Sequence, residues 1–162
     1  MKRVIVRATL LAGLVAGVAS AGLGGAGFVG AAWAQGAADA VAQRQAGFKA
    51  MGAATGEVKK VMDAGGDLTT VSAKAAEISA FAKRMPALFP VGSGAASGAK
   101  TRALPAIWEN KSDFDANAGI LGTAADKLEM ALKANDKAAT AAAFTAMTGQ
   151  CGACHRPYRA PQ

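Results

Sequence analysis

Large apolar side chains are scarce over most of this sequence. Alanine alone contributes 43 of the 162 residues, and residues 1–34 hold 13 of the 41 larger apolar residues, which leaves 28 for residues 35–162. Such a chain can build one domain with a lean core, but it is too short and too poor in large side chains for a multidomain enzyme. A lean core also suggests that something other than side chains fills part of the interior.

Two sequence patterns are missing altogether. No stretch of useful length alternates polar and apolar residues in the way that a half-buried strand does. No nucleophile, general base or pair of carboxylates marks a catalytic site. We therefore expect an all-α protein that is not an enzyme.

Negative charge is in the minority, and the first charges of the chain are all positive. Lys and Arg number 18 against 11 Asp and Glu, for a net charge of +7, and Lys2, Arg3 and Arg7 precede an uncharged stretch that continues to residue 38. This arrangement predicts a secretory signal peptide over residues 1–34, cleaved after Ala34 or after Ala21.

The signal peptide predicts that the remaining domain, residues 35–162, is exported, and this limits its possible partners. An uncleaved membrane anchor is the alternative to a signal peptide, since the stretch is long enough to span a bilayer, but seven Gly within residues 13–30 weaken it as a membrane helix. We expect a protein of the periplasm of a Gram-negative bacterium, with no membrane attachment after cleavage. Nucleic acid is then excluded as a partner, and the modest positive charge suits acidic proteins or membranes instead.

Helical spacing marks four segments of the domain. Apolar residues recur every three or four positions in residues 39–62, 68–85, 105–132 and 136–158. Between the second and third segments, residues 86–105 are rich in Pro and Gly and predict a long surface connection. The fold expected is an antiparallel four-helix bundle with one long crossover loop and two short connections.

Short signals mark the ends of these segments. Gly65-Gly66 is expected to stop the first helix, and Asp67 to cap the second. Asn135 or Asp136 is expected to cap the fourth helix.

The chemistry is concentrated in the fourth segment. Cys151-Gly152-Ala153-Cys154-His155 holds the only two Cys and the only His of the chain, in the C-x-x-C-H arrangement of a covalent c-type haem attachment site. Positions three apart lie on one face of a helix, so both thiols can reach the two vinyl groups of one porphyrin edge. His155 then turns its imidazole toward the iron as the proximal ligand. One haem c also supplies the apolar volume that the lean core lacks.

Other uses of the two thiols compete with haem. A simple disulfide, or a haem-free interaction protein built on one, is the plainest alternative for an exported chain. A thioredoxin-like redox pair is expected beside a βαβ pattern, which this sequence does not have. Zinc lacks a fourth ligand, because no further Cys or His exists to complete the tetrahedron.

The motif and its surroundings resemble the cytochrome c′ family, the class II c-type cytochromes, over residues 37–160. The family implies an antiparallel four-helix bundle that holds one haem between its helices, usually as a periplasmic homodimer. The match also puts Tyr158 among the residues that border the haem. The marks that carry the resemblance, besides C-x-x-C-H, are Tyr158-Arg159, Arg44-Gln45, Leu88-Phe89-Pro90 and Ile107-Trp108.

The distal side of the haem separates two classes within this family. Low-spin members carry a Met four residues after the Arg of the first helix as the sixth ligand, whereas cytochromes c′ proper carry a nonpolar residue there. That position is Phe48 here, and the resemblance therefore implies a high-spin, five-coordinate haem. Met51 lies one turn further on and could ligate only if the helix moved. The other methionines of the domain are expected to be core filler: Met62, Met85, Met130 and Met147.

Four polar residues are expected near the haem. Arg44 occupies an apolar seam, so we expect a buried anion beside it, such as a haem propionate, unless its stem packs and its head reaches water. The resemblance implies that Gln45 borders the haem edge and that Arg159, one turn after His155, shields the proximal face, although simple solvation is an equal alternative. Arg102 is a weaker propionate candidate.

These parts predict a haem protein for one-electron transfer. The resemblance implies that an open sixth position binds nitric oxide or carbon monoxide. The expected partners are a redox protein, such a diatomic gas and a second copy of the chain. The alternatives that stay open are a Met-ligated low-spin carrier and the haem-free thiol protein.

Overall fold

The computed structural model describes residues 25–161, with side chains from residue 36 onward. Helices dominate this part of the chain, and its one β-pairing is an isolated antiparallel bridge between Ala103 and Arg159. In chain order the α-helices and the short 3₁₀ helices (η) are α1 Gly25–Asp63, η1 Leu68–Val71, α2 Ser72–Arg84, η2 Met85–Leu88, η3 Ala95–Ser97, α3 Ala106–Glu109, α4 Lys111–Lys133 and α5 Lys137–Tyr158.

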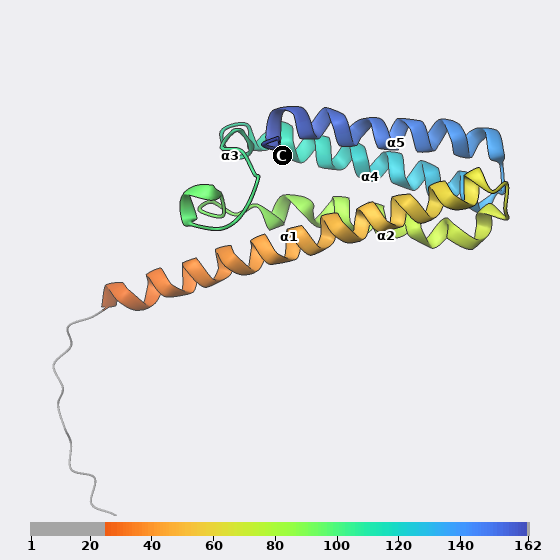
Figure 1. Cartoon of the computed structure of the whole chain (residues 1–162). Helices are drawn as coiled ribbons and strands as arrows, with labels where there is room; N and C mark the ends of the chain where they lie inside the picture. Colours follow the sequence, from red (N-terminus) through yellow and green to blue (C-terminus); the bar gives the residue numbers. More distant parts are fainter. Residues whose placement is uncertain (1–24, 162) are drawn as a thin grey trace, which may run out of the picture.

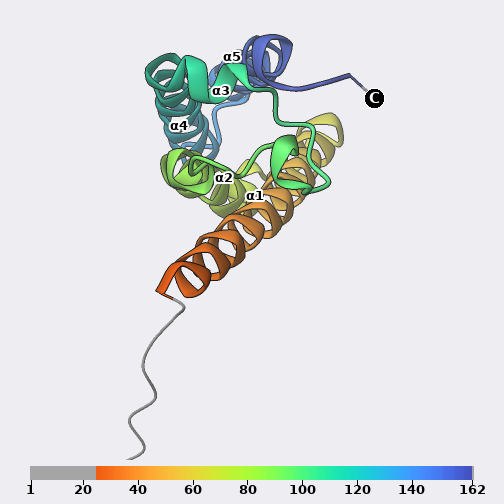
Figure 2. The same ribbon diagram turned by 90° about the vertical axis from the view of Figure 1, so that its left-hand side faces the viewer.

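The four long helices form an antiparallel bundle of two layers. α1 packs against α2, α2 against α4, and α4 against α5. Figure 1 shows α4 and α5 side by side above α1 and α2, and the end-on view in Figure 2 separates the two layers. The two short connections lie at one end of the bundle, and the crossover between α2 and α4 lies at the other. The predicted all-α four-helix bundle is confirmed.

Most of the predicted helix ends are confirmed. α1 stops where Gly65 adopts a positive φ of 65°, a conformation that costs Gly little. The Asp67 carboxylate accepts a hydrogen bond from the Thr69 backbone and caps η1, through which α2 begins. Of the two candidate caps for α5, Asp136 is the one that accepts from a helix N–H, that of Ala139.

The expected third helix is divided. Instead of one helix from residue 105 onward, the single turn α3 ends at Asn110, whose backbone (φ −121°, ψ 46°) is not helical, and α4 starts at Lys111. The Asn110 amide side chain donates back to Ala106 O at 3.3 Å. Asn competes for local backbone partners in this way, which explains the break.

The apolar seams of the helices meet in one core. Leu68, Ile78, Leu128 and Leu132 are almost fully buried, each contributing roughly 1.5–3 kcal/mol. The Phe81 ring of α2 packs directly on Gly47 of α1, where a Cβ would lie 1.9 Å from the ring. Met62, Met85 and Met147 contact or belong to this core, as expected. Met130 does not: it is 62% exposed on α4, so its prediction as core filler is wrong.

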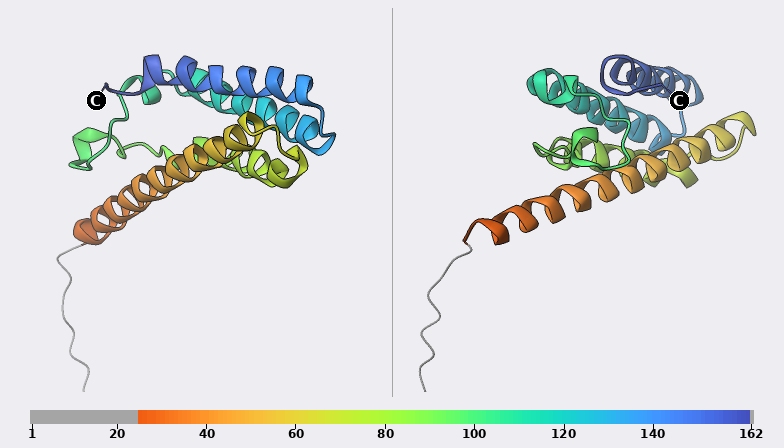
Figure 3. Two further views of the ribbon diagram at one scale, coloured as in Figure 1. Left: turned by 45° about the vertical axis from the view of Figure 1, so that its right-hand side comes forward. Right: turned by 60° about the vertical axis from the view of Figure 1, so that its left-hand side comes forward.

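The beginning of α1 extends past the rest of the bundle (Figure 3). The predicted signal peptide falls mainly on residues 1–24, outside the described residues, and its cleavage sites stay predictions. Across residues 25–161, none of the helices combines the length and the apolar character needed to cross a bilayer.

Candidate haem site

The two Cys and the single His lie on the last two turns of α5. Cys151, Cys154 and His155 are all partly buried. The two thiols are three positions apart in sequence, which places them one above the other on the same helix face. The motif therefore presents two sulfur atoms and an imidazole to one place in the bundle.

That place is a cavity of about 710 Å³, within the range of small-molecule and cofactor sites. It opens between α1 and α5 at the crossover end of the bundle. Its apolar walls come from Phe48, Phe89, Ile107 and Phe114. The structure brings together around it all nine residues singled out from the sequence: Arg44, Gln45, Phe48, Arg102, Cys151, Cys154, His155, Tyr158 and Arg159.

Burial makes both thiols poor nucleophiles. It raises the pKa of Cys151 and of Cys154, and for Cys154 the neighbouring Cys151 and the Asp113 carboxylate raise it further. The two residues are free thiols rather than a disulfide. Redox-active Cys pairs have lowered thiol pKa values, so this environment disfavours a thiol–disulfide function.

The surroundings of His155 favour the neutral form of its imidazole. Burial lowers its pKa, and the positive charges of Arg159 and Arg102 lower it further. The Nη1 atom of Arg159 lies 3.4 Å from Nδ1 of the ring. A neutral imidazole is the form in which His binds a metal.

The end of α5 is tied to the end of the crossover loop. Leu104 N donates to Tyr158 O at 3.0 Å, and Ala160 N donates to Arg102 O at 2.8 Å. These bonds flank the bridge between Ala103 and Arg159. The pairing brings Arg102 and Arg159, which are distant in sequence, to the same edge of the cavity.

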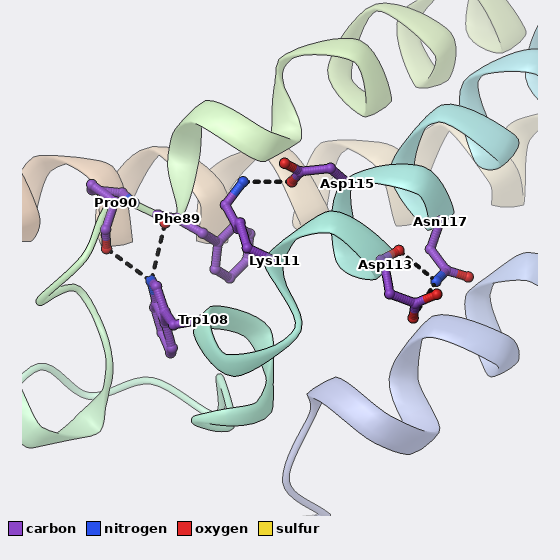
Figure 4. A network of polar contacts seen from close by, with 7 residues as sticks. All are labelled: Phe89, Pro90, Trp108, Lys111, Asp113, Asp115 and Asn117. Carbon is purple, nitrogen blue, oxygen red and sulfur yellow. Dashed lines mark hydrogen bonds and ion pairs between the residues drawn. The ribbon is translucent and has the colours of Figure 1, made fainter.

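Tyr158 is fixed by a carboxylate from α4. Its ring is buried and packs edge-on against Phe114, with ring centroids 5.3 Å apart. Its hydroxyl donates to Asp113 Oδ2, which raises the pKa of Tyr158 to about 12. Asp113 also accepts from the Asn117 amide (Figure 4).

We expect the phenol of Tyr158, the one tyrosine of the chain, to titrate near pH 12 instead of 10 in the folded protein. Because the folded pKa is raised, the stabilisation is complete below pH 10 and is lost between about pH 10 and 12. Ultraviolet absorbance of tyrosinate measures this directly. Asp113→Asn is expected to return the pKa toward 10, and a wild-type value near 10 contradicts the prediction.

Arg44, on α1, is the residue around which the crossover loop folds. Its side chain is 2% exposed, and its terminal nitrogens donate to Leu88 O, Ser93 Oγ, Ser93 O and Thr101 Oγ1 at 3.2, 2.8, 2.7 and 2.9 Å. The guanidinium carbon also lies 4.4 Å from the centre of the Phe89 ring. Burial lowers the pKa of Arg44, but its ordinary value is so high that the group stays charged.

These contacts compensate the charge of Arg44 from within the protein, and a haem propionate beside it stays a prediction. The acceptors within the described residues are neutral oxygens, and together they take all four N–H groups of the two terminal nitrogens. Several hydrogen bonds and one aromatic face thus surround the guanidinium. Gln45, the next residue, reaches the same loop by donating to Lys100 O at 2.7 Å.

A second set of contacts fixes the aromatic wall of the cavity. The Trp108 indole donates to Phe89 O at 3.1 Å and to Pro90 O at 3.0 Å, which joins α3 to the loop (Figure 4). The Phe89 ring packs edge-on against Phe114, with centroids 4.7 Å apart. The wall is therefore held by backbone as well as by side-chain contacts.

Sequence reasoning missed several residues that shape this site. Ser93 and Thr101 lie in the Gly-rich loop, where no periodicity reveals which side chains turn inward. Asp113 accepts a hydrogen bond from Tyr158, 45 residues away in sequence, and no local sequence pattern predicts that contact. Lys49 lines the cavity, although its helical position is typical of a solvated face.

Sequence comparison places the chain among bacterial haem proteins. A family model described as "Cytochrome C'" matches residues 39–159. Cytochrome c-556 of Agrobacterium fabrum strain C58 is 38% identical over 125 residues, covering 76% of this chain and 82% of that protein. Cytochrome c′ of Rhodopseudomonas palustris strain CGA009 is 37% identical over 124 residues, with 75% and 82% covered.

Solved structures agree with this placement. Cytochrome c′ from Thermochromatium tepidum superposes with a TM-score of 0.70 at 32% identity, covering 77% of this chain and 97% of that one. Cytochrome c′ from Rhodopseudomonas palustris gives a TM-score of 0.67 at 36% identity, covering 76% and 98%. With the family match spanning most of the domain and the fold shared throughout, this chain belongs to the cytochrome c′ family, whose members bind haem c.

Proposed function

We propose that this protein carries one haem c, bound by thioether bonds to Cys151 and Cys154 with His155 as the proximal ligand, and that it serves one-electron transfer. The observation that carries the proposal is that the C-x-x-C-H residues of α5 all open into one cavity of about 710 Å³. Haem binding is a property of the family; the attachment and the ligand in this chain are the proposal.

The lining of the cavity fits such a group. Aromatic and aliphatic side chains form its walls, as a porphyrin plane requires, and cationic side chains lie at its edge, as two propionates require. The four N–H groups on the terminal nitrogens of Arg44 are already taken by the crossover loop. We therefore assign Arg102 and Arg159 as the first partners of the propionates. Arg44 and Gln45 instead hold the crossover loop in place around the haem.

The distal wall favours a five-coordinate iron. Phe48 lines the cavity from α1 and packs edge-on against Phe81, with ring centroids 5.2 Å apart, and a phenyl ring has no donor atom. When bound, haem supplies reversible one-electron chemistry and, at an open sixth position, binds nitric oxide or carbon monoxide. A variant of cytochrome c′ from Alcaligenes xylosoxidans, 26% identical to this chain, has been solved as a nitric oxide complex.

A second candidate is a low-spin electron carrier. Met51 also lines the cavity, one turn of α1 beyond Phe48, and a thioether is a known axial ligand of c-type haem. This candidate differs from the first only in the sixth ligand. The coordination state therefore needs a direct measurement.

Location and assembly follow from the signal segment and the family. Family members are periplasmic proteins of Gram-negative bacteria, and the positively charged N-terminus of this chain agrees with export. One solved relative, 29% identical, is described as having a ligand-controlled dimer dissociation. We extend both properties to this chain as a periplasmic homodimer that meets a redox partner.

The visible absorption spectrum of the purified protein tests the proposal. We expect a Soret band that stays with the polypeptide under denaturing conditions, because thioether bonds survive unfolding. Adding carbon monoxide to the reduced protein is expected to shift this band, as it does when the sixth position is open. No Soret band would refute the proposal, and a spectrum that carbon monoxide leaves unchanged would favour the Met-ligated candidate.

A further inference from the structure

The ring of Phe48 in the cavity wall packs against two other rings. Phe81, on α2, lies edge-on to it with ring centroids 5.2 Å apart, and Phe89, in the crossover loop, lies edge-on at 6.5 Å. Phe48 itself is only partly buried and lines the cavity. The place of its ring therefore depends on what fixes these two neighbours.

Phe89 is fixed by the contacts of the crossover loop. The guanidinium carbon of Arg44 lies 4.4 Å from the centre of its ring, and the Phe114 ring lies 4.7 Å away on centroids. Its carbonyl oxygen also accepts a hydrogen bond from the Trp108 indole. This neighbour of Phe48 is held by hydrogen bonds as well as by packing.

Phe81 is fixed by packing, because its side chain has no polar atom. It is 5% exposed, and its ring lies directly on Gly47 of α1, the residue before Phe48. A Cβ at residue 47 would lie 1.9 Å from Cε2 of the ring and 2.5 Å from Cδ2 and from Cζ, far inside van der Waals contact. The ring can occupy this place only because residue 47 is Gly.

Gly47 differs in this respect from two other glycines of the same helix. A Cβ at Gly52 or at Gly56 would meet nothing within 4 Å. Gly in a helix interior is less favourable than Ala, which is the commonest residue of this chain. Of these three positions, residue 47 alone has a steric need for Gly, and that need is the space for the Phe81 ring.

We propose that Gly47 and Phe81 are positioning residues that hold the Phe48 ring over the sixth position of the haem iron and so set the rate at which a diatomic gas binds there. The inference rests on the proposed function, in which Phe48 forms the distal wall. Neither Gly47 nor Phe81 lines the cavity, whereas Phe48 does. Both residues therefore act through Phe48 and do not touch the gas.

The experiment measures the association rate of carbon monoxide with the reduced holo protein after flash photolysis. In Gly47→Ala the new Cβ forces the Phe81 ring away from α1, and since α1 carries Phe48, the two rings separate. We expect association to become about tenfold faster, the scale of one edge-on aromatic contact. Phe81→Ala removes the ring and is expected to accelerate association to a similar extent.

Each variant has a matched control. Gly56→Ala makes the same substitution on the same helix, where the Cβ meets nothing. Ile78→Ala truncates a buried residue of α2, three positions before Phe81 and outside the lining of the cavity. Both controls are expected to keep the wild-type rate. A wild-type rate in Gly47→Ala, or an equal acceleration in Ile78→Ala, would overturn the proposal, since in the second case any loosening of the core would act.

Urea unfolding gives a measurement that does not depend on gas binding. Alone, Gly47→Ala is expected to lower the free energy of unfolding, because it displaces the Phe81 ring. In the Phe81→Ala background the same substitution is expected to raise it, because Ala is the better helix former once no ring lies on residue 47. The same sign in both backgrounds would contradict the steric coupling on which the proposal depends.

Failure of the proposed function gives a different result. Absence of a Soret band, or a reduced protein that does not bind carbon monoxide, refutes the proposed function and this proposal with it. A normal Soret band and a normal carbon monoxide adduct, with one association rate shared by the wild type, Gly47→Ala and Phe81→Ala, refute only the positioning role.

Discussion

Replacing Arg44 with Met is expected to lower the free energy of unfolding by about 3 kcal/mol. The substitution keeps a long apolar stem but removes four hydrogen bonds from a charged donor, each worth roughly 1.5–3 kcal/mol in isolation and less in sum. It also leaves the carbonyl oxygen of Ser93, a residue that is fully buried, without its hydrogen bond from Arg44. Urea unfolding of the holo protein, followed by far-ultraviolet circular dichroism, measures the loss.

Two variants check the mechanism behind this number. Gln45→Met removes a neighbouring but exposed side chain with one hydrogen bond to the same loop, and we expect it to cost less than about 1 kcal/mol. Ser93→Ala combined with Arg44→Met is expected to cost less than the two changes added together, because both act on one network. Additive costs, or an Arg44→Met protein as stable as the Gln45→Met protein, would show that Arg44 does not hold the loop.

The fold was largely predictable because its signals are local. Helical spacing of apolar residues, Gly65 at a positive φ and the caps Asp67 and Asp136 all act within a few residues of one another. The break at Asn110 was not predicted, since the apolar period continues through it. Met130 was misplaced for a related reason: composition identifies Met as apolar, but only the packing of neighbouring helices decides whether a given position is covered.

The residues of the site that lie on one helix could be predicted from the sequence. The contacts that join it to residues distant in sequence could not. Cys151, Cys154 and His155 share consecutive turns, so their spacing alone indicates a common face. The partners of Arg44 lie 44–57 residues away in a loop without periodicity. The sequence indicates that the buried guanidinium of Arg44 needs partners to stabilise its charge. Which atoms act as those partners depends on how the crossover loop folds back over α1.

Replacing Phe48 with Met is expected to convert the haem iron from five-coordinate to six-coordinate. Phe48 lines the distal wall from α1, and a Met there carries its thioether sulfur into the space that the phenyl ring fills. Met is flexible and fits irregular gaps, so the packing against Phe81 and Phe89 should survive in part. We expect a low-spin visible spectrum and a loss of rapid carbon monoxide binding by the reduced protein.

Met51→Leu is the companion variant, because Met51 lines the same wall about 4.5 Å further along the helix. Leu matches Met in volume and has no donor atom, so a five-coordinate wild type should keep its spectrum in this variant. A change of spin state in Met51→Leu would instead identify Met51 as the sixth ligand and the protein as a low-spin carrier. An unchanged high-spin spectrum in Phe48→Met would mean that Phe48 does not lie over the iron, since a thioether placed there binds it.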